Sequence, residues 1–300
     1  MKERILGRTG LGVTPLGFGG MELWHLDQKQ ADILLNAAID NGINYIDTSP
    51  EYLRSEQLIG NAIANRRKEF VLATKCGDNM TGAGPKYVFD RKTCMANLEE
   101  SLRLLKTDYI DVWQLHGLMP EYIADGEADD VILCMLEAKK AGKVRFLGAT
   151  MKNGSPEEAM YPADFGYNAI KEFMNWHVFD VIQIVYGGLT RRNELCIKKA
   201  AEKGIGIIAR GVLKKYKSSY DELFELSKLS ELFGENETRN EFLIRFALTD
   251  QAISCMLIGT QSKEHMIGNI KAVEKGVLPP DLYDEAKRRL DAVGITPGQA

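Results

Sequence analysis

The chain has 300 residues and a formal net charge of −4, because 42 Asp and Glu outnumber 38 Lys and Arg. A protein that binds nucleic acid mainly through its charge carries a basic excess, so this balance argues against that class of function. With 45% hydrophobic and 27% charged residues, the composition is that of a globular protein able to bury a large core without disulfides or metals.

The five cysteines are scattered without a CxxC pair and the chain has only four histidines, so a dedicated metal cage is not expected. The N-terminal segment lacks the apolar stretch of a signal peptide, and no run approaches the ~18 apolar residues of a membrane span. We therefore expect a cytoplasmic protein with no metal, no membrane partner and no nucleic-acid partner.

A short hairpin is expected at residues 4–14, with its turn at Arg8-Thr9-Gly10. From residue 15 onward one pattern repeats: a short apolar run, a polar or glycine-containing turn, and a helical segment. Most runs are continuously apolar, which is typical of parallel strands covered on both faces. Eight such runs occur, at residues 15–20, 44–49, 70–75, 109–116, 144–150, 181–187, 204–210 and 254–259.

Amphipathic segments separate these runs, for example residues 27–42 and 93–106, in which apolar residues recur three and four positions apart. Eight strand–helix units predict one (β/α)₈ barrel domain over residues 1–300, although a doubly wound open sheet also fits the pattern. The glycine-rich turn at residues 17–20 lacks the GxGxxG spacing of a dinucleotide-binding open sheet. This favours the barrel.

Two segments fall outside the repeat. Residues 211–240 form a long insertion between the seventh strand and its helix, and insertions at that end of a barrel usually build a binding site. Residues 281–293 predict an extra C-terminal helix.

Four polar side chains stand at the predicted exits of three neighbouring strands, where barrels carry their functional residues. Asp47 and Tyr52 follow the second strand, Lys75 ends the third and His116 ends the fourth. A lysine cation lowers the pKa of a nearby phenol, an aspartate can hold that lysine, and a histidine can orient a carbonyl oxygen. Each residue alone has a structural explanation, such as packing or a turn cap, but together they favour an acid–base site.

Residues 44–60, NYIDTSPEYLRSEQLIG, resemble the signature of the aldo-keto reductase family around its catalytic aspartate and tyrosine. LATK ending at Lys75 and DYIDVWQLH ending at His116 match its other signature positions. The resemblance covers essentially the whole chain. It implies a (β/α)₈ barrel with an N-terminal hairpin and an extra C-terminal helix. It also implies an enzyme that reduces an aldehyde or ketone with hydride from NAD(P)H.

The resemblance also implies the roles of the four residues. Tyr52 is the general acid, Lys75 lowers its pKa, Asp47 pairs with Lys75, and His116 orients the substrate. The family's double-bond reductases carry a glutamate at the histidine position, so His116 favours reduction of a C=O bond.

Cofactor contacts follow from the same resemblance. Thr150 and Met151 replace a serine and an asparagine that hold the carboxamide, Gln183 matches the family's glutamine, and Arg210 replaces a tyrosine that often stacks on the nicotinamide. A planar guanidinium can stack on a ring, or pair with the pyrophosphate. The full set expected at the cofactor is Gly20, Met21, Thr150, Gln183, Arg210, Gly211, Leu213, Gly259, Gln261, Ser262, His265 and Asn269.

Residues 257–273 resemble the family's segment for the adenosine 2′-phosphate, at a helix start whose free N–H groups and dipole suit a phosphate. A family lysine aligns with Gly259 and an arginine with His265, so Lys263, His265 and Lys271 are the remaining cationic candidates. On family grounds we expect NADP(H) more than NAD(H).

Trp24, Leu53 and Leu118 are predicted to line an apolar pocket for a small carbonyl or alcohol substrate. Two other functions fit the sequence. One is a Schiff-base lyase or aldolase that uses Lys75 as nucleophile, which needs a neutral lysine and is opposed by Asp47. The other is a nucleotide-binding redox sensor that docks a partner. The sequence predicts neither the physiological substrate nor the oligomeric state.

Overall fold

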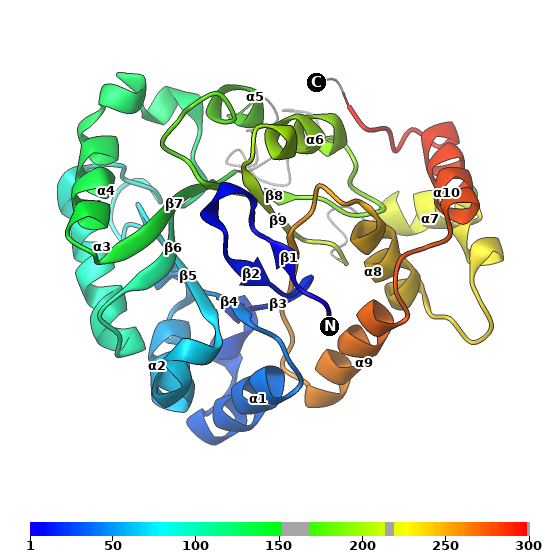
Figure 1. The fold of residues 1–300 in the computed structure, drawn as a ribbon, viewed down its shortest axis with the longest axis horizontal. Helices are drawn as coiled ribbons and strands as arrows, with labels where there is room; N and C mark the ends of the chain where they lie inside the picture. Colours follow the sequence, from blue (N-terminus) through cyan, green and yellow to red (C-terminus); the bar gives the residue numbers. More distant parts are fainter. Residues whose placement is uncertain (152–168, 214–218, 299–300) are drawn as a thin grey trace.

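The eight apolar runs form eight parallel strands. The computed structural model describes residues 1–151, 169–213 and 219–298. Each strand overlaps one predicted run: β3 (Leu16–Gly19), β4 (Tyr45–Asp47), β5 (Val71–Cys76), β6 (Ile110–Leu115), β7 (Val144–Thr150), β8 (Val181–Val185), β9 (Gly206–Arg210) and β10 (Cys255–Ile258). Strand β10 pairs with β3, which closes the barrel seen in Figure 1 and excludes the open sheet.

Helices surround this barrel (Figure 1). They are α1 (Gln28–Asp40), α2 (Ser55–Ile63), α3 (Arg91–Leu105), α4 (Asp130–Lys140), α5 (Ala169–Phe173), α6 (Glu194–Glu202), α7 (Ser219–Ser227), α8 (Arg239–Thr249), α9 (Lys263–Glu274) and α10 (Pro280–Ala292). Helix α1 begins where Asp27 and Gln30 form a reciprocal capping box, which satisfies two otherwise free N–H groups. Among the described helices, none is long and apolar enough to cross a membrane.

The predicted hairpin closes one end of the barrel. Strands β1 (Arg4–Ile5) and β2 (Gly12–Val13) are antiparallel and lie across the barrel in Figure 1. Leu6 and Val13 are fully buried against the apolar side chains of that end. Apolar packing therefore fills the end at which the strands begin, and a polar site has room at the other end.

The insertion predicted at residues 211–240 contributes helix α7 and a short 3₁₀ helix, η8 (Leu229–Leu232). Residues 214–218 of this insertion lie outside the described residues. Phe224 and Leu229 pack with Phe242 of α8 and Leu290 of α10 in a separate apolar cluster. The C-terminal helix predicted at residues 281–293 is confirmed as α10, and this cluster attaches it to the barrel.

A buried carboxyl group lies between the barrel and α2. Glu56 is 1% exposed, and its Oε1 accepts a hydrogen bond of 2.6 Å from the Thr74 hydroxyl of β5. Its Oε2 has no hydrogen-bond partner among the described residues. Burial raises the pKa of Glu56 from 4.5 to about 7, because lost hydration outweighs the stabilisation of the carboxylate by the hydroxyl groups of Thr74 and Ser101.

This carboxyl makes stability depend on pH. Its raised pKa means that its contribution to the free energy of unfolding is present at low pH and is lost as pH rises from 4.5 through about 7. Glu56→Gln keeps the shape but cannot ionise. We expect the variant to gain roughly 3 kcal/mol over the wild type between pH 5 and pH 8.5. Urea unfolding at both pH values measures this, and a difference that does not change with pH would contradict it.

Candidate active site

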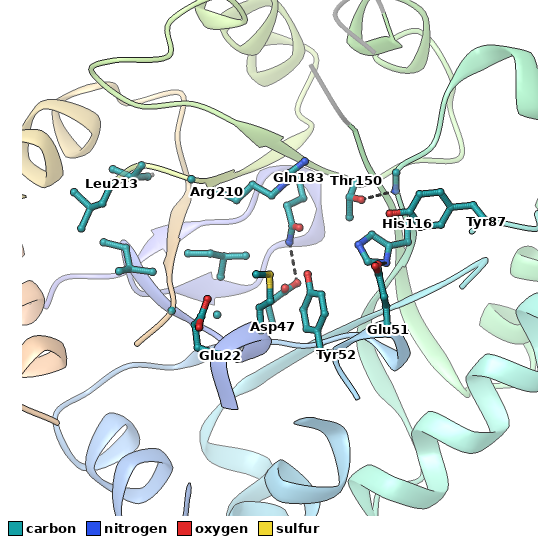
Figure 2. Close-up of a pocket in the computed structure, with 18 of the residues that line it drawn as sticks. Glu22, Asp47, Glu51, Tyr52, Tyr87, His116, Thr150, Gln183, Arg210 and Leu213 are labelled. Carbon is teal, nitrogen blue, oxygen red and sulfur yellow. Dashed lines mark hydrogen bonds and ion pairs between the residues drawn. The ribbon is translucent and has the colours of Figure 1, made fainter. Parts of the chain in front are cut away.

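The carboxyl ends of the strands surround a cavity of about 480 Å³, shown in Figure 2. Loops after several strands and the strand ends themselves contribute to its wall. The lining residues are Gly19, Met21, Glu22, Asp47, Glu51, Tyr52, Lys86, Tyr87, His116, Gly117, Thr150, Gln183, Arg210, Gly211, Val212, Leu213, Leu257, Ile258 and Gly259. Three of the four predicted catalytic residues are among them, and the fourth, Lys75, is buried beneath Tyr52 and bonded to Asp47.

Lys75 and Asp47 form an ion pair inside the barrel. The Lys75 Nζ lies 2.6 Å from Asp47 Oδ1 and 2.6 Å from the Thr48 carbonyl oxygen, and its side chain is fully buried. Asp47 Oδ2 accepts from the Gln183 amide at 2.8 Å (Figure 2) and from the Gln114 amide at 3.3 Å. Every charge in this cluster is therefore bonded.

The ion pair sets the charge of Lys75. Burial alone would lower the pKa of Lys75, but the charge and hydrogen bond of Asp47, together with the charges of Tyr52 and Asp78, outweigh burial and hold the pKa above its usual value. A lysine nucleophile must be neutral to attack a carbonyl. The pairing with Asp47 thus disfavours the Schiff-base alternative.

Tyr52 lies above this pair. It ends the 3₁₀ helix η3 (Pro50–Tyr52), and its hydroxyl points into the cavity in Figure 2. The Lys75 Nζ is 4.8 Å from the centre of the Tyr52 ring. Burial raises the pKa of Tyr52 above 10, and the charges of Lys75 and Arg210 lower it only in part. Lys75 lowers the pKa of Tyr52, as predicted, but burial raises it more, so the phenol keeps its proton at neutral pH.

His116 follows β6 and stands edge-on to Tyr52, with ring centres 5.9 Å apart and an interplanar angle of 84°. Its Nδ1 lies 2.7 Å from Oδ1 of Asp78, in the loop after β5. Asp78 is 2% exposed and was not among the predicted site residues. A carboxylate thus holds the imidazole beside the phenol.

The opposite wall offers polar groups suited to a nicotinamide. The Thr150 hydroxyl accepts from the Gly117 N–H at 2.8 Å (Figure 2), and the Arg210 guanidinium donates to the Met151 carbonyl oxygen at 2.9 Å. A Cβ added to Gly259 would lie only 2.9 Å from the Gly19 carbonyl oxygen, so this part of the wall is bare backbone. Such a wall leaves room for a flat, amide-bearing group.

The predicted cofactor residues divide into two groups. Seven of them line the cavity: Met21, Thr150, Gln183, Arg210, Gly211, Leu213 and Gly259. Five do not line it: Gly20, Gln261, Ser262, His265 and Asn269. Gly20 packs against the strand ends, because a Cβ added there would lie 2.8 Å from the Asp47 carbonyl oxygen. Of the other four, Gln261 and Ser262 precede α9, His265 lies in its first turn and Asn269 lies in its middle.

Two carboxylates accompany the start of α9. Gln261 donates to Glu22 Oε2 at 3.3 Å, and the Ser262 hydroxyl donates to Glu264 Oε2 at 2.8 Å. Ser262 also caps the helix by accepting from the His265 N–H at 3.2 Å. Glu22 and Glu264 oppose a phosphate at this place by charge repulsion, and the sequence comparison with the family did not single them out.

The predicted substrate residues lie outside the cavity lining. Trp24 is 39% exposed and Leu53 is 63% exposed. Leu118 is fully buried in the hydrophobic core, and its N–H donates to the Thr150 carbonyl oxygen at 2.8 Å. The expectation that Leu118 contacts a substrate is therefore not met, because the chain turns inward after His116.

Several lining residues were missed. Glu51 precedes Tyr52 in the signature and could have been found from that position. Lys86 and Tyr87 come from a loop whose strand-like bridge between Asp78 and Tyr87 returns it over the barrel. No pattern in the sequence indicates that return.

Comparison with known proteins gives one consistent family. The model of the Aldo/keto reductase family matches residues 15–290. The chain is 29% identical over 296 residues to the uncharacterized oxidoreductase YqkF of Bacillus subtilis, covering 91% of each chain. It is 25% identical over 286 residues to L-galactose dehydrogenase of Arabidopsis thaliana, covering 90% of this chain and 87% of that one. The holo form of aldo-keto reductase AKR11C1 from Bacillus halodurans superimposes with a TM-score of 0.81, at 27% identity and 96% coverage of each chain.

Removing one partner of the buried pair should destabilise the fold. Asp47→Asn or Lys75→Met alone leaves one buried charge uncompensated, and we expect each to lower the free energy of unfolding by about 3–5 kcal/mol. The double variant should lose much less than the sum of the two. Urea unfolding of all four proteins measures the coupling. The exposed pair Arg103–Glu100, at 2.6 Å, is the control and should show little coupling. Additive losses at the buried pair would refute its role.

Proposed function

Because the chain belongs to the aldo/keto reductase family and is an oxidoreductase, we propose that it transfers a hydride between NAD(P)H and the carbonyl carbon of an aldehyde or ketone. One observation carries this proposal. A buried Lys75–Asp47 pair lies beneath Tyr52, which burial keeps protonated and which meets His116 at a cavity whose other wall offers polar groups for a nicotinamide. This is the arrangement that carbonyl reduction needs.

The residues on that wall suit the cofactor. A bound nicotinamide dinucleotide supplies the hydride. Thr150 and Gln183 would hold its carboxamide, with the Gln183 amide nitrogen already fixed by Asp47 at 2.8 Å. Arg210, Gly211 and Leu213 would line the rest of its path, Arg210 by stacking or by pairing with phosphate charge.

Tyr52 is the proton donor in this proposal. Burial keeps its proton in place at neutral pH, so the phenol is ready to protonate a carbonyl oxygen as the bond is reduced. The phenolate that results gains stability from the Lys75 cation, which its bonds to Asp47 and Thr48 hold 4.8 Å from the Tyr52 ring centre. His116 orients the carbonyl oxygen beside the hydroxyl.

Tyr52→Phe tests the acid. We expect it to lower the rate of carbonyl reduction by about 10²- to 10⁴-fold, the usual contribution of a general acid, while the dissociation constant of the cofactor stays within about twofold. A panel of aldehydes and ketones followed at the nicotinamide absorbance gives the rate, and fluorescence quenching gives cofactor affinity. Tyr122→Phe, which removes a hydroxyl outside the cavity lining, serves as control and should match the wild type. Cofactor binding by the wild type without turnover of any carbonyl would instead support a redox sensor.

The family resemblance favours NADP(H), and Lys263 and His265 are the groups at the start of α9 that would hold its 2′-phosphate. The negative charges of Glu22 and Glu264 oppose a phosphate at this place. The preference for NADP(H) over NAD(H) therefore depends on Lys263 and His265. We expect Lys263→Ala/His265→Ala to weaken NADPH binding about tenfold and to leave NADH binding within about twofold. Titration of the protein's fluorescence with each cofactor measures both, with Lys275→Ala beyond the C-terminal end of α9 as control. Equal losses of affinity for both cofactors would show that Lys263 and His265 do not bind the 2′-phosphate.

A further inference from the structure

One ring nitrogen of His116, Nδ1, is surrounded by oxygen atoms. Nδ1 lies 2.7 Å from Asp78 Oδ1, 3.2 Å from Ser49 Oγ and 3.4 Å from Glu51 Oε2. His116 also lines the cavity. With Nδ1 turned toward these oxygens, Nε2 is the nitrogen that can reach a bound molecule.

The hydrogen atoms in this cluster can be assigned from its bonds. Ser49 has one hydroxyl proton, and its shorter contact, 2.6 Å, is to Asp78 Oδ2, so that proton goes to the carboxylate. Burial alone would raise the pKa of Asp78, but the charge and hydrogen bond of His116 and the bond from Ser49 hold it below its usual value. Asp78 therefore brings no proton of its own. The contact of 2.7 Å to His116 then requires a hydrogen on Nδ1.

Asp78 is itself fixed in place. Its backbone N–H donates to Asn97 Oδ1 at 3.0 Å, and its carbonyl oxygen accepts from the Asn97 amide at 3.2 Å. The Glu51 N–H donates to its Oδ2 at 3.3 Å. The backbone of Asp78 is thus fixed, and its Oδ2 is held by two donors. Its other oxygen, Oδ1, therefore faces the His116 imidazole in one orientation.

We infer that Asp78 is a positioning residue that keeps a proton on Nδ1 of His116, so that His116 can donate to a carbonyl oxygen from Nε2 only when the imidazole carries a second proton. The inference deepens the proposed function and rests on it for its consequence. A neutral ring with hydrogen on Nδ1 has only a lone pair at Nε2. It can accept from an alcohol but offers nothing to an aldehyde or ketone oxygen.

Charged and aromatic side chains from two loops surround the ring. From the loop after β5, Asp78 faces the ring directly, and Tyr87 stacks obliquely at 5.4 Å between ring centres. From the loop after β4, Glu51 approaches Nδ1, while Tyr52 meets the ring edge-on. Lys86 pairs with Glu51 and offsets part of its charge.

Asp78→Asn is expected to reverse the proton position. The Ser49 hydroxyl and the Glu51 N–H both donate to Oδ2, so the amide oxygen of Asn should take that place. Its NH₂ group then faces Nδ1 and donates to it. The neutral imidazole must in that case carry its proton on Nε2.

Imidazole ¹⁵N spectra of the full chain without cofactor or substrate test this directly. Only four histidines need to be distinguished, and His116→Gln identifies the signal of His116. We expect Nδ1 of the neutral ring to be protonated in the wild type and in Ser49→Ala, and Nε2 to be protonated in Asp78→Asn. A wild-type neutral ring with its proton on Nε2 overturns the inference, even if Asp78→Asn does not fold.

The kinetic consequence has its own test. Wild-type carbonyl reduction should fall with rising pH as the second proton of His116, followed by the same spectra, is lost. Asp78→Asn should lose this pH dependence, because its neutral imidazole already carries the donor hydrogen on Nε2. Asp125→Asn, an exposed carboxylate, is the matched control. Identical pH profiles for Asp78→Asn and wild type overturn the inference, whereas the expected spectra without any carbonyl turnover would overturn only the proposed function.

Discussion

The buried pair of Lys75 and Asp47 is the constraint around which the site is built. Removing two ions from water costs several kcal/mol each, and only good geometry with further hydrogen bonds recovers it. The barrel meets that condition through register: Lys75 lies opposite Gln114, and the β7–β8 pairing sets Gln183 opposite Thr150. Asp47 then accepts from both glutamines as well as from the lysine. A change in the register of any of these strands would leave a buried charge without partners.

This requirement also explains why the two ends of the barrel differ. At one end the hairpin brings Leu6 and Val13 against Tyr45, Val112 and other apolar side chains. Arg4 adds hydrogen bonds of 2.6 Å to the Leu248 and Ile253 carbonyl oxygens, so packing and side-chain-to-backbone bonds together close this end. At the other end the same strands carry the ion pair, so polar side chains and water-accessible space must adjoin it. The chemistry is therefore confined to the carboxyl ends of the strands.

The strands were predictable because parallel strands covered on both faces produce continuous apolar runs, and all eight runs became strands. The meeting of the four candidate catalytic residues was predictable because the ends of those strands meet in space. Asp78 was not, since its approach to His116 depends on a loop fixed by Asn97 on α3. The bond between Gln261 and Glu22 joins residues 239 positions apart, and no local pattern reports it. Leu118 shows the converse error: it lies near His116 in sequence, but its side chain is in the core.

The pKa of Tyr52 illustrates what sequence reasoning leaves out. The identity of Lys75 predicts a lowered pKa, and the lysine does act in that direction, yet burial raises the pKa further than Lys75 and Arg210 lower it. Burial depends on how the whole cavity is assembled, so the identities of Tyr52 and Lys75 alone do not predict it. The outcome suits a proton donor, since a phenol ionised at neutral pH would have nothing to give.

Two buried aspartates, Asp47 and Asp78, act on the two groups proposed to contact a substrate, Tyr52 and His116. Asp47 acts on Tyr52 through Lys75, and Asp78 acts on His116 through Nδ1. Both carboxylates are at least 97% buried, so neither needs to touch a substrate to influence proton transfer. Their proposed roles differ: Asp47 holds the charge that would stabilise a phenolate, and Asp78 makes the hydrogen bond that would fix a tautomer. The two are linked, because the charges of Lys75 and Asp78 also act on each other. A cavity built in this way separates the release of a proton from the orientation of the oxygen that receives it.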